Sequence, residues 1–571
     1  MRFGLTRIVA KAYLSQSSMD ALTHTYETQS DRLAPVAARC DIVRHPAPIP
    51  TVRGFPHTIA ATLFILTWTI LNLGYLAFLC PHDLAPDEAH YWHWSRQLDW
   101  SYYSKGPLVA WLIRGSCELL GTNVLAVRLP AMLSSAALLA GLYVLIADVL
   151  RDRRLAFSAM VCAATMPAIS AGAVLMTIDP PFLTCWCWAL VGVRRALAIR
   201  RSSLRWWLLA SICSALGVLA KYPMLLLPAS AIGYLLIHRR REFRRPGIWV
   251  FLAITLLGCV PILVWNAGNE WVSFRHVLGQ AGLGEPTPAA WFSPFAYVGG
   301  QIGILLGFWF AAFAAGVWRF RRTSDTGLSL MWWASVPVWG LFLLASVRTA
   351  GQVNWPAAAY IGGSVLAAAW IRDSLAGPHR RLVLRFLIAT TALGITCSHW
   401  LRFPQVVRPT LARLTSSPSE DNPTPIRKLD PTARLQGWRT LAAEIDRIRD
   451  RVRRGSGHDP ALAGMLWTLP GELSFYCRDH PPAYSFGSAL ADRHSQYDCW
   501  RPNPVADPEL FRGRTFLYVG EAIPNFDEVF DRVEAPMYVT HFEAGIPIAR
   551  WTVWVCNGYR GFPERRTRTG Y

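Results

Sequence analysis

The chain has 571 residues, of which 52% are hydrophobic and only 16% charged, and its formal net charge is +20. Its apolar residues fall in long runs, which excludes an ordinary soluble protein, because runs of about 20 apolar residues cross a bilayer as helices. The positive charge does not indicate nucleic-acid binding, because the Arg clusters lie between the hydrophobic runs, where they set membrane orientation.

The first 57 residues are polar and mixed in charge, without a continuous apolar core. No cleavable signal peptide is evident, because the first long apolar run begins only near residue 58. We expect residues 1–57 to form a disordered cytoplasmic tail. The alternative is that the true start of the protein lies further downstream. The first apolar run is then an uncleaved signal anchor.

Eleven hydrophobic segments are predicted to span the membrane. Lys221, Tyr222 and Pro223 separate the fifth from the sixth, so these two are expected as short spans joined by a tight turn. The predicted spans are 58–79, 124–147, 155–175, 180–198, 205–220, 222–237, 247–265, 295–318, 328–347, 356–371 and 383–402.

Arginine clusters predict the orientation of these spans. One set of loops is rich in Arg, the alternate set carries few basic residues, and Arg-rich loops face the cytoplasm. The N-terminus is therefore expected in the cytoplasm, and the segment after the last span on the outer face. The Arg-rich stretches are 151–154, 194–205, 239–245, 319–322 and 372–385.

The first outer loop, residues 80–123, contains the motif DEAHYWHW at 87–94. The letters DEAH also occur in helicases, but a helicase needs a phosphate loop of the type G-x-x-x-x-G-K-[ST], and Gly-Lys occurs nowhere in this chain. The helicase interpretation is therefore excluded. The aromatic and aliphatic residues of EAHYWHWSRQLDW and PLVAWLIRGSCELLG predict two short helices in the headgroup plane.

Asp87 and Glu88 form an adjacent pair of carboxylates at the membrane surface. Their desolvation is costly unless a ligand or a reaction uses them. The alternative is that Asp87, which follows Pro86, caps a helix. His90 and His93 have a spacing that suits a metal, but aromatic packing at the interface is the favoured interpretation.

Asp179 lies in LMTIDPPF, within the very short second outer loop, and two prolines after it stiffen the chain. A charge in so short an apolar turn needs a partner, unless it caps the following span. Few basic residues share this face, and each alone is compatible with snorkelling to the headgroups. Together with the carboxylates they predict a site where acids remove a proton and cations hold an anionic leaving group. These cations are Lys105, Lys221, Arg275 and Arg348.

Residues 403–571 contain no predicted span. GWRTLAAEIDRIRDRV has helical periodicity, whereas GRTFLYVG and YVTHFEAG have the alternation and turn residues of strands. We predict a small α+β domain on the outer face. Its cysteines are Cys477, Cys499 and Cys556, and both a Cys477–Cys499 disulfide and free thiols are compatible with that compartment.

The stretch PDEAHYWHWSRQLDWSYYSKGPLVAWLI resembles the first-loop signature of bacterial family 39 glycosyltransferases, relatives of the protein O-mannosyltransferases and of the aminoarabinose transferases that modify lipid A. The similarity covers roughly residues 58–370 and continues in order through LMTIDPPFLTCWCWAL, GVLAKYPMLLLP, VWNAGNEWVSFRH and VNWPAAAYI. It implies a GT-C fold: an all-α polytopic membrane domain at 58–402 with about eleven transmembrane helices and interfacial helices in the first outer loop. Residues 403–571 are then a periplasmic α+β domain.

The resemblance implies an inverting glycosyltransferase. It would move a sugar from a polyprenyl-phosphate donor to a hydroxyl of an envelope glycolipid, polysaccharide or protein, on the outer face of the bacterial inner membrane. A lipid-borne donor fits a chain without a nucleotide-binding loop. No nucleic-acid partner is expected.

The resemblance also assigns roles to residues. Asp87 is the base, with Glu88 as the adjacent catalytic carboxylate, and Asp179 orients the acceptor or a divalent cation, the one candidate cofactor. Lys105 holds the donor phosphate, with Arg275 and Arg348 as helpers. Further donor or acceptor contacts are predicted at Tyr102, Tyr103, Lys221 and Asn266.

The chain departs from the family pattern at Ser104-Lys105-Gly106-Pro107, where relatives often have an acidic residue or His and two prolines. Lys105 also resembles the lysine before proline in the lipid A branch, so the departure leaves the sugar open without excluding the family. Two other functional classes fit the sequence less well. A lipid-linked-sugar transporter or flippase would show related halves, and DEAHYWHW has no repeat. An anchor protein would not need lone acids in two outer loops.

Overall fold

The computed structural model describes residues 55–199, 203–280, 292–348, 351–490 and 492–563. All of them belong to one compact unit that begins at Ile49. Residues 1–54, which make up most of the predicted tail, lie outside the described residues.

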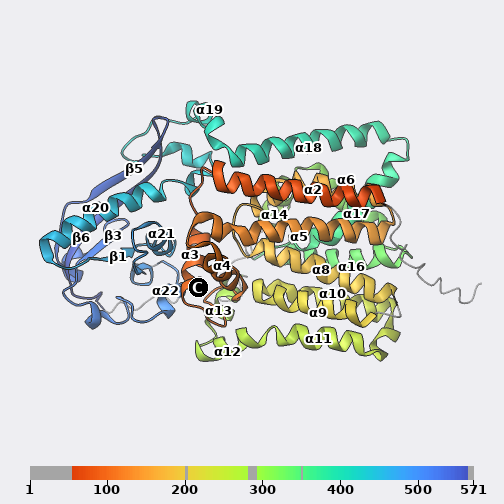
Figure 1. Cartoon of the computed structure of the whole chain (residues 1–571), viewed down its shortest axis with the longest axis horizontal. Coiled ribbons are helices and arrows are strands. Elements are labelled where there is room, and N and C mark those ends of the chain that lie inside the picture. Colours follow the sequence, from red (N-terminus) through yellow and green to blue (C-terminus); the bar gives the residue numbers. More distant parts are fainter. Residues whose placement is uncertain (1–54, 200–202, 281–291, 349–350, 491, 564–571) are drawn as a thin grey trace, which may run out of the picture. The chain divides into compact units, whose positions relative to one another are not determined.

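Helices dominate up to residue 402, and the long ones run side by side (Figure 1). Every predicted span contains helical structure. The helices are α2 (Phe55–Gly74), η2 (Tyr75–Leu79), α3 (Pro86–Arg96), α4 (Leu108–Leu120), α5 (Val124–Leu150), α6 (Arg153–Ala164), α7 (Pro167–Gly172), α8 (Asp179–Ala198), α9 (Ser203–Ala220), η3 (Tyr222–Leu225), α10 (Leu226–His238), η4 (Arg240–Arg244), α11 (Pro246–Leu257), α12 (Val260–Gly268), α13 (Val272–Gln280), α14 (Ser293–Ile304), α15 (Phe308–Phe320), α16 (Thr326–Ala345), α17 (Ala359–Leu375) and α18 (Arg380–Arg402).

Six helices within the described ranges are long and apolar enough to cross a membrane, or seven if the bent pair α14 and α15 counts as one span. The predicted number of eleven is therefore not confirmed. The pair α14 and α15 bends by 110°. The bend occurs at Leu306 and Gly307, which have positive φ angles of 52° and 68°, and a positive φ cannot continue a right-handed helix.

The first outer loop differs in part from its prediction. Helix α4 buries Val109, Ala110 and Ile113 and exposes Leu119 and Leu120, as expected of a helix at an interface. Helix α3, in contrast, buries all its residues from Glu88 to Ser95. Its aromatic residues are packed inside the protein, in a cluster that includes Phe475 of the C-terminal part.

The C-terminal part contains a six-stranded sheet. The strand order is β2-β1-β3-β6-β4, and β5 also pairs with β6; β1 is parallel to β2 and β3, whereas β6 is antiparallel to β3, β4 and β5. Helix α20 (Trp438–Ser456) packs its apolar residues, such as Leu441 and Ile445, against this sheet. The strands are β1 (Ala461–Gly464), β2 (Ala483–Ser485), β3 (Phe516–Val519), β4 (Phe530–Val533), β5 (Met537–Glu543) and β6 (Ile546–Tyr559). The other helices are η5 (Pro404–Val406), α19 (Arg408–Arg413), η6 (Pro425–Lys428), η7 (Ala433–Leu435), α21 (Leu469–Tyr476), η8 (Gly487–Leu490), α22 (Gln496–Cys499), η9 (Pro508–Phe511) and α23 (Phe526–Val529).

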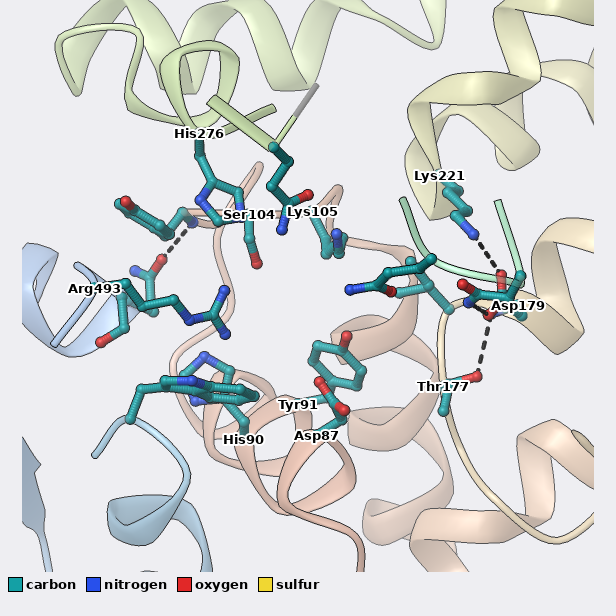
Figure 2. A pocket seen from close by; sticks show the side chains of 18 of the residues that line it. Asp87, His90, Tyr91, Ser104, Lys105, Thr177, Asp179, Lys221, His276 and Arg493 are labelled. Atoms are coloured by element: carbon teal, nitrogen blue, oxygen red, sulfur yellow. Dashed lines mark hydrogen bonds and ion pairs between the residues drawn. The ribbon is translucent and has the colours of Figure 1, made fainter. Parts of the chain in front are cut away.

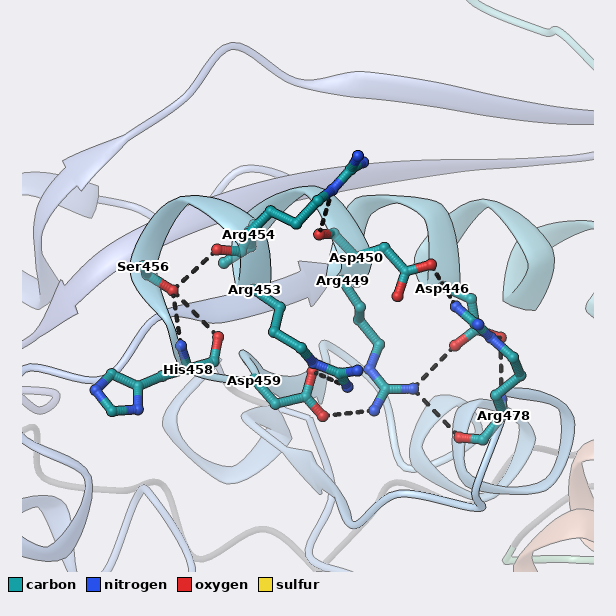
Figure 3. Close-up of polar contacts among 10 residues, drawn as sticks. Asp446, Arg449, Asp450, Arg453, Arg454, Ser456, His458, Asp459 and Arg478 are labelled. Carbon is teal, nitrogen blue, oxygen red and sulfur yellow. Dashed lines mark hydrogen bonds and ion pairs between the residues drawn. The ribbon is translucent and has the colours of Figure 1, made fainter.

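A buried arginine ties the end of α20 to its surroundings (Figure 3). The Arg449 guanidinium donates to Asp446 at 2.9 Å, to Asp459 at 2.6 Å and to the Arg478 carbonyl at 3.2 Å. Such charge-assisted bonds compensate the cost of burying the guanidinium. Cys477 and Cys499 are free thiols, so the disulfide alternative is not realised in this structure.

Hydrogen bonds join the first outer loop to the C-terminal part. The Leu84 amide donates to the Tyr476 hydroxyl at 2.6 Å, and the Trp438 amide donates to Asp83 at 2.9 Å. The Tyr103 amide donates to the Gln496 side chain at 2.7 Å. The C-terminal part is thus bonded to the same loop that carries DEAHYWHW.

Candidate active site

Helix α3 sends its two carboxylates in different directions. Pro86 occupies the first helical position, and both acids lie in the first turn, where they interact favourably with the helix dipole. Because successive helical residues are rotated by about 100°, Asp87 and Glu88 cannot share one environment. Asp87 is accessible to solvent, whereas Glu88 is fully buried.

Glu88 is held in a buried network. Its carboxylate pairs with Arg128 of α5 at 2.8 Å, and both side chains are 0% exposed. It also accepts from the Ala85 amide at 2.8 Å and from the Met176 amide at 2.7 Å. Helix capping therefore belongs to Glu88, not Asp87, and Glu88 joins the first outer loop to α5 and to the second.

Asp87 lines a polar cavity of about 230 Å³ (Figure 2). Separate segments of the membrane part and of the C-terminal part contribute to its walls. Asp87 and Tyr91 lie on one side, the Asp179–Lys221 pair on another, and Arg493 extends from a third (Figure 2). The lining residues are Asp87, His90, Tyr91, Tyr103, Ser104, Lys105, Thr177, Ile178, Asp179, Lys221, His276, Gln280, Gln352, Asn354, Trp355, Trp467, Arg493, His494, Ser495 and Gln496.

The cavity changes the protonation of its groups. Desolvation raises the pKa of the Asp87 carboxyl, and the nearby Lys105 ammonium partly opposes this. Desolvation lowers the pKa of Lys105 to about 8, assisted by the charge of Lys221. Desolvation lowers the pKa of His276 to about 4 and that of His90 well below its ordinary value, so both imidazoles are neutral at pH 7. A carboxyl with a raised pKa beside an ammonium with a lowered pKa is suited to proton transfer.

Asp179 is held by two partners from distant segments. Its carboxylate accepts from the Lys221 ammonium at 2.7 Å and from the Asn354 amide at 2.6 Å. It forms no side-chain cap on α8, so the capping alternative does not apply. Asn354 was not among the predicted site residues, although it lies in the VNWPAAAYI motif.

One apolar cavity adjoins the polar one, and a second is lined in part by the same turn before α17. The first, of about 140 Å³, shares Lys105, Lys221 and Trp355 with it and continues along Tyr222 and Phe342. The second is an apolar groove of about 170 Å³ that Leu142, Ile146, Ile169, Trp309, Phe313 and Val353 line with others. In the turn before α17, Gln352 and Asn354 line the polar cavity, whereas Val353 lines the groove.

Several predicted site residues do not line the polar cavity. Tyr102 is buried with its ring stacked on Trp94, and its hydroxyl donates to backbone carbonyls of α3 and the following turn. Asn266 is buried and accepts from the Ser273 amide at 3.1 Å, so it fixes the turn between α12 and α13. Arg275 is exposed and pairs with Glu270 at 3.2 Å. Arg348 is exposed at the end of α16, outside the lining.

Sequence reasoning missed the contribution of the C-terminal part. Arg493 lies over the Trp467 ring, 4.3 Å from its centroid, and reaches into the cavity. The stretch HSQYDCW, which begins one residue later, contains no pattern that predicts a contribution to the site. Nothing in the local sequence indicates that this segment approaches DEAHYWHW.

The described residues contain no group of three His, Cys, Asp or Glu side chains arranged to hold a metal ion. His90 accepts a hydrogen bond from Trp94 at 3.1 Å, and His93 contacts the Tyr497 hydroxyl at 3.2 Å. These two histidines therefore pack among aromatic rings, as the favoured interpretation of their spacing predicts.

The fold is similar to that of solved structures of ArnT, in agreement with the GT-C fold that the sequence resemblance implies. The structure of ArnT from Cupriavidus metallidurans bound to undecaprenyl phosphate matches with a TM-score of 0.57, covering 87% of this chain and 97% of that one at 18% identity. The apo structure of the same protein matches with the same TM-score at 16% identity. At such identities the match establishes the fold alone.

Sequence comparisons extend the relationship. Residues 104–265 match the family model described as dolichyl-phosphate-mannose-protein mannosyltransferase. The lipid A galacturonosyltransferase RgtD of Rhizobium johnstonii is 29% identical over 313 residues, which are 54% of this chain and 64% of that protein. The undecaprenyl phosphate-alpha-4-amino-4-deoxy-L-arabinose arabinosyl transferase of Pseudomonas aeruginosa is 30% identical over 34% of this chain and 39% of its own. The chain thus spans less than two thirds of these curated relatives.

Proposed function

We propose that this protein is an inverting glycosyltransferase that moves a sugar from a polyprenyl-phosphate donor to a hydroxyl of an envelope glycolipid. The observation that carries the proposal is one polar cavity lined by both the Asp87 carboxyl and the Lys105 ammonium, with an apolar cavity adjoining on the lysine side. The similarity to the lipid A galacturonosyltransferase RgtD supports a glycolipid over a polysaccharide or protein acceptor.

Asp87 is the proposed general base. It accepts the proton of the acceptor hydroxyl, whose oxygen forms a bond to the anomeric carbon while the bond from that carbon to the phosphate oxygen breaks. The electron pair of the broken bond stays on the phosphate. Desolvation makes the Asp87 carboxylate a stronger base than an ordinary aspartate, because it destabilises the charged form.

Lys105 is the proposed phosphate ligand. Charge accumulates on the phosphate as it leaves, so a fixed ammonium stabilises the transition state more than the ground state. Lys105 lies where the polar cavity meets an apolar one, which suits the junction between a phosphate and a hydrocarbon tail. Arg275 and Arg348 have no place in this proposal, because neither lines the cavity.

Asp179 and Glu88 have supporting roles. The bonds of Asp179 to Lys221 and Asn354 leave its carboxylate at the cavity wall, where it orients the acceptor. Glu88 is a positioning residue: its pair with Arg128 fixes the first turn of α3, which carries Asp87. Tyr103 is retained as a contact for donor or acceptor because it lines the cavity.

The proposed location is the bacterial inner membrane, with residues 58–402 as the membrane domain, 403–571 as the periplasmic domain and the cavity on the outer face. The charge asymmetry of the loops supports this orientation.

A transfer assay tests the proposal. The purified full chain in lipid nanodiscs is incubated with an undecaprenyl-phosphate-linked sugar and lipid A, and both lipids are analysed by mass spectrometry. We expect lipid A to gain the mass of one sugar residue while free undecaprenyl phosphate appears in equal amount. Intact donor and unchanged acceptor, tested over a panel of sugars and envelope acceptors, contradict the proposal.

The pH dependence of kcat/KM should be bell-shaped. Activity rises with pH as the Asp87 carboxyl, whose pKa is raised, loses its proton, and it falls above pH 8 as the Lys105 ammonium, whose pKa is lowered to about 8, loses its own. The Lys105→Arg variant keeps its charge at all accessible pH values. We expect it to lose the alkaline decline and keep the acidic one. An alkaline limb that is the same in both proteins would assign the decline to another group.

A further inference from the structure

The polar cavity has a cation, Arg493, on the side away from the apolar cavity. Of the cationic side chains that the structure describes in its lining, Lys221 is neutralised by Asp179 at 2.7 Å. Lys105 borders both the polar and the adjoining apolar cavity, where the lipid phosphate is proposed to lie. Arg493 borders the polar cavity but not the apolar one. A phosphate held at Lys105 would leave the sugar on the side of Arg493.

Arg493 is held in place, and its hydrogen-bonding groups are available. The guanidinium lies 4.3 Å from the centroid of Trp467, a geometry that supports its plane by stacking. Among the described residues it has no ion pair, although its charge is felt by Asp87 and Lys105. A guanidinium presents its N–H donors as a rigid fork that matches a carboxylate bidentately.

The other polar groups near Arg493 do not replace a negative charge. His90 and His276 are neutral at pH 7 because desolvation lowers their pKa. Apart from Asp179, which pairs with Lys221, Asp87 is the one carboxylate among the described lining residues, and the proposed reaction requires it as a base. A sugar with an ammonium group would be repelled by Arg493 and Lys105, and a neutral sugar would leave the guanidinium unpaired once water is displaced.

We propose that Arg493 is a specificity residue that binds a carboxylate on the transferred sugar, so that the donor is a polyprenyl-phosphate-linked uronic acid. The inference rests on the proposed function and names its substrate class. It also gives the C-terminal part a role in substrate recognition, because this part supplies the group that binds the sugar carboxylate.

Donor binding without acceptor tests the assignment. Dissociation constants are measured in nanodiscs for three ligands: undecaprenyl phosphate, its uronic-acid conjugate and its neutral hexose conjugate. For Arg493→Gln we expect binding of the uronic-acid conjugate to weaken by about 10- to 100-fold. Binding of the other two ligands should change by less than about threefold. Arg493→Lys should recover part of the loss, because it keeps the charge but not the fork.

Arg512→Gln is the matched control, since Arg512 is an exposed arginine of the same part of the chain, paired with Glu509 at the surface. It should bind all three ligands as the unchanged protein does. Equal weakening of all three ligands by Arg493→Gln would make Arg493 a phosphate ligand and overturn the proposal. Unchanged donor binding with a raised KM for phosphorylated lipid A would assign it to the acceptor and also overturn it. The proposed function would survive both results, whereas it fails if the unchanged protein transfers no sugar.

Discussion

The Asp87→Asn variant is expected to lose activity by about 10²- to 10⁴-fold in kcat, the contribution typical of a positioned general base. Asparagine has nearly the same shape but cannot accept the proton of the attacking hydroxyl. The contacts that fix the first turn of α3 are those of Glu88, which caps the helix and pairs with Arg128. The loss should therefore appear in turnover and not in folding or donor affinity. Initial rates of sugar transfer at saturating donor measure it.

Glu118→Gln is the control for this variant. Glu118 is an exposed carboxylate of α4 that pairs with Arg114 on the same helix, outside the cavity. It should transfer sugar at the normal rate. An Asp87→Asn protein that folds, binds undecaprenyl phosphate and still turns over normally would remove Asp87 from the chemistry and leave the cavity without its proposed base.

The Arg128→Met variant should be destabilised by about 3–5 kcal/mol, the cost of leaving one member of a buried ion pair unpaired. Arg128 donates to Glu88 and to the carbonyls of His82 and Asp83 at 3.1 and 2.6 Å, so its loss frees several buried acceptors. Because Glu88 anchors the first turn of α3, the variant should also misplace Asp87 and lose activity. Thermal unfolding in detergent, compared with the unchanged protein, measures the loss of stability.

Two further variants establish the cause. Arg114→Met removes an exposed partner of Glu118 and should change stability by less than about 1 kcal/mol. Combining Glu88→Leu with Arg128→Met removes both charges and should be more stable than Arg128→Met alone. The recovery should be incomplete, because the amides of Ala85 and Met176 lose their acceptor. Unaltered thermal unfolding of Arg128→Met would show that the pair does not hold α3.

The residues that line the polar cavity come from segments that lie far apart in the sequence. Asp87 comes from α3, Asp179 from the start of α8, Asn354 from the turn before α17, and Arg493 from the loop before α22. Lys221 lies in the break between α9 and η3, where the sequence already indicated an interruption. The breaks in the helices thus bring polar side chains and backbone groups to the end of the bundle.

The sequence alone determined which segments are helical in the membrane part and where the reactive loop lies. Long apolar runs must satisfy their backbone hydrogen bonds internally, so every predicted span contains helix, including the interrupted pair around Lys221. The motif around Asp87, with Lys105, Asp179 and Lys221, also indicated the residues that meet in the cavity. These features are local properties of composition and spacing, which a linear pattern records.

Only the tertiary structure separated Asp87 from Glu88, placed Tyr102 and Asn266 in structural contacts and left Arg275 outside the cavity. It also brought Arg493 to the site across some 400 positions of chain from Asp87. The physical reason is that a side chain's role depends on its direction from the helix and on partners from distant segments. Arg128 holds Glu88 in a buried ion pair, and Trp467 positions Arg493. Packing creates those partnerships, and hydropathy along the chain does not encode them.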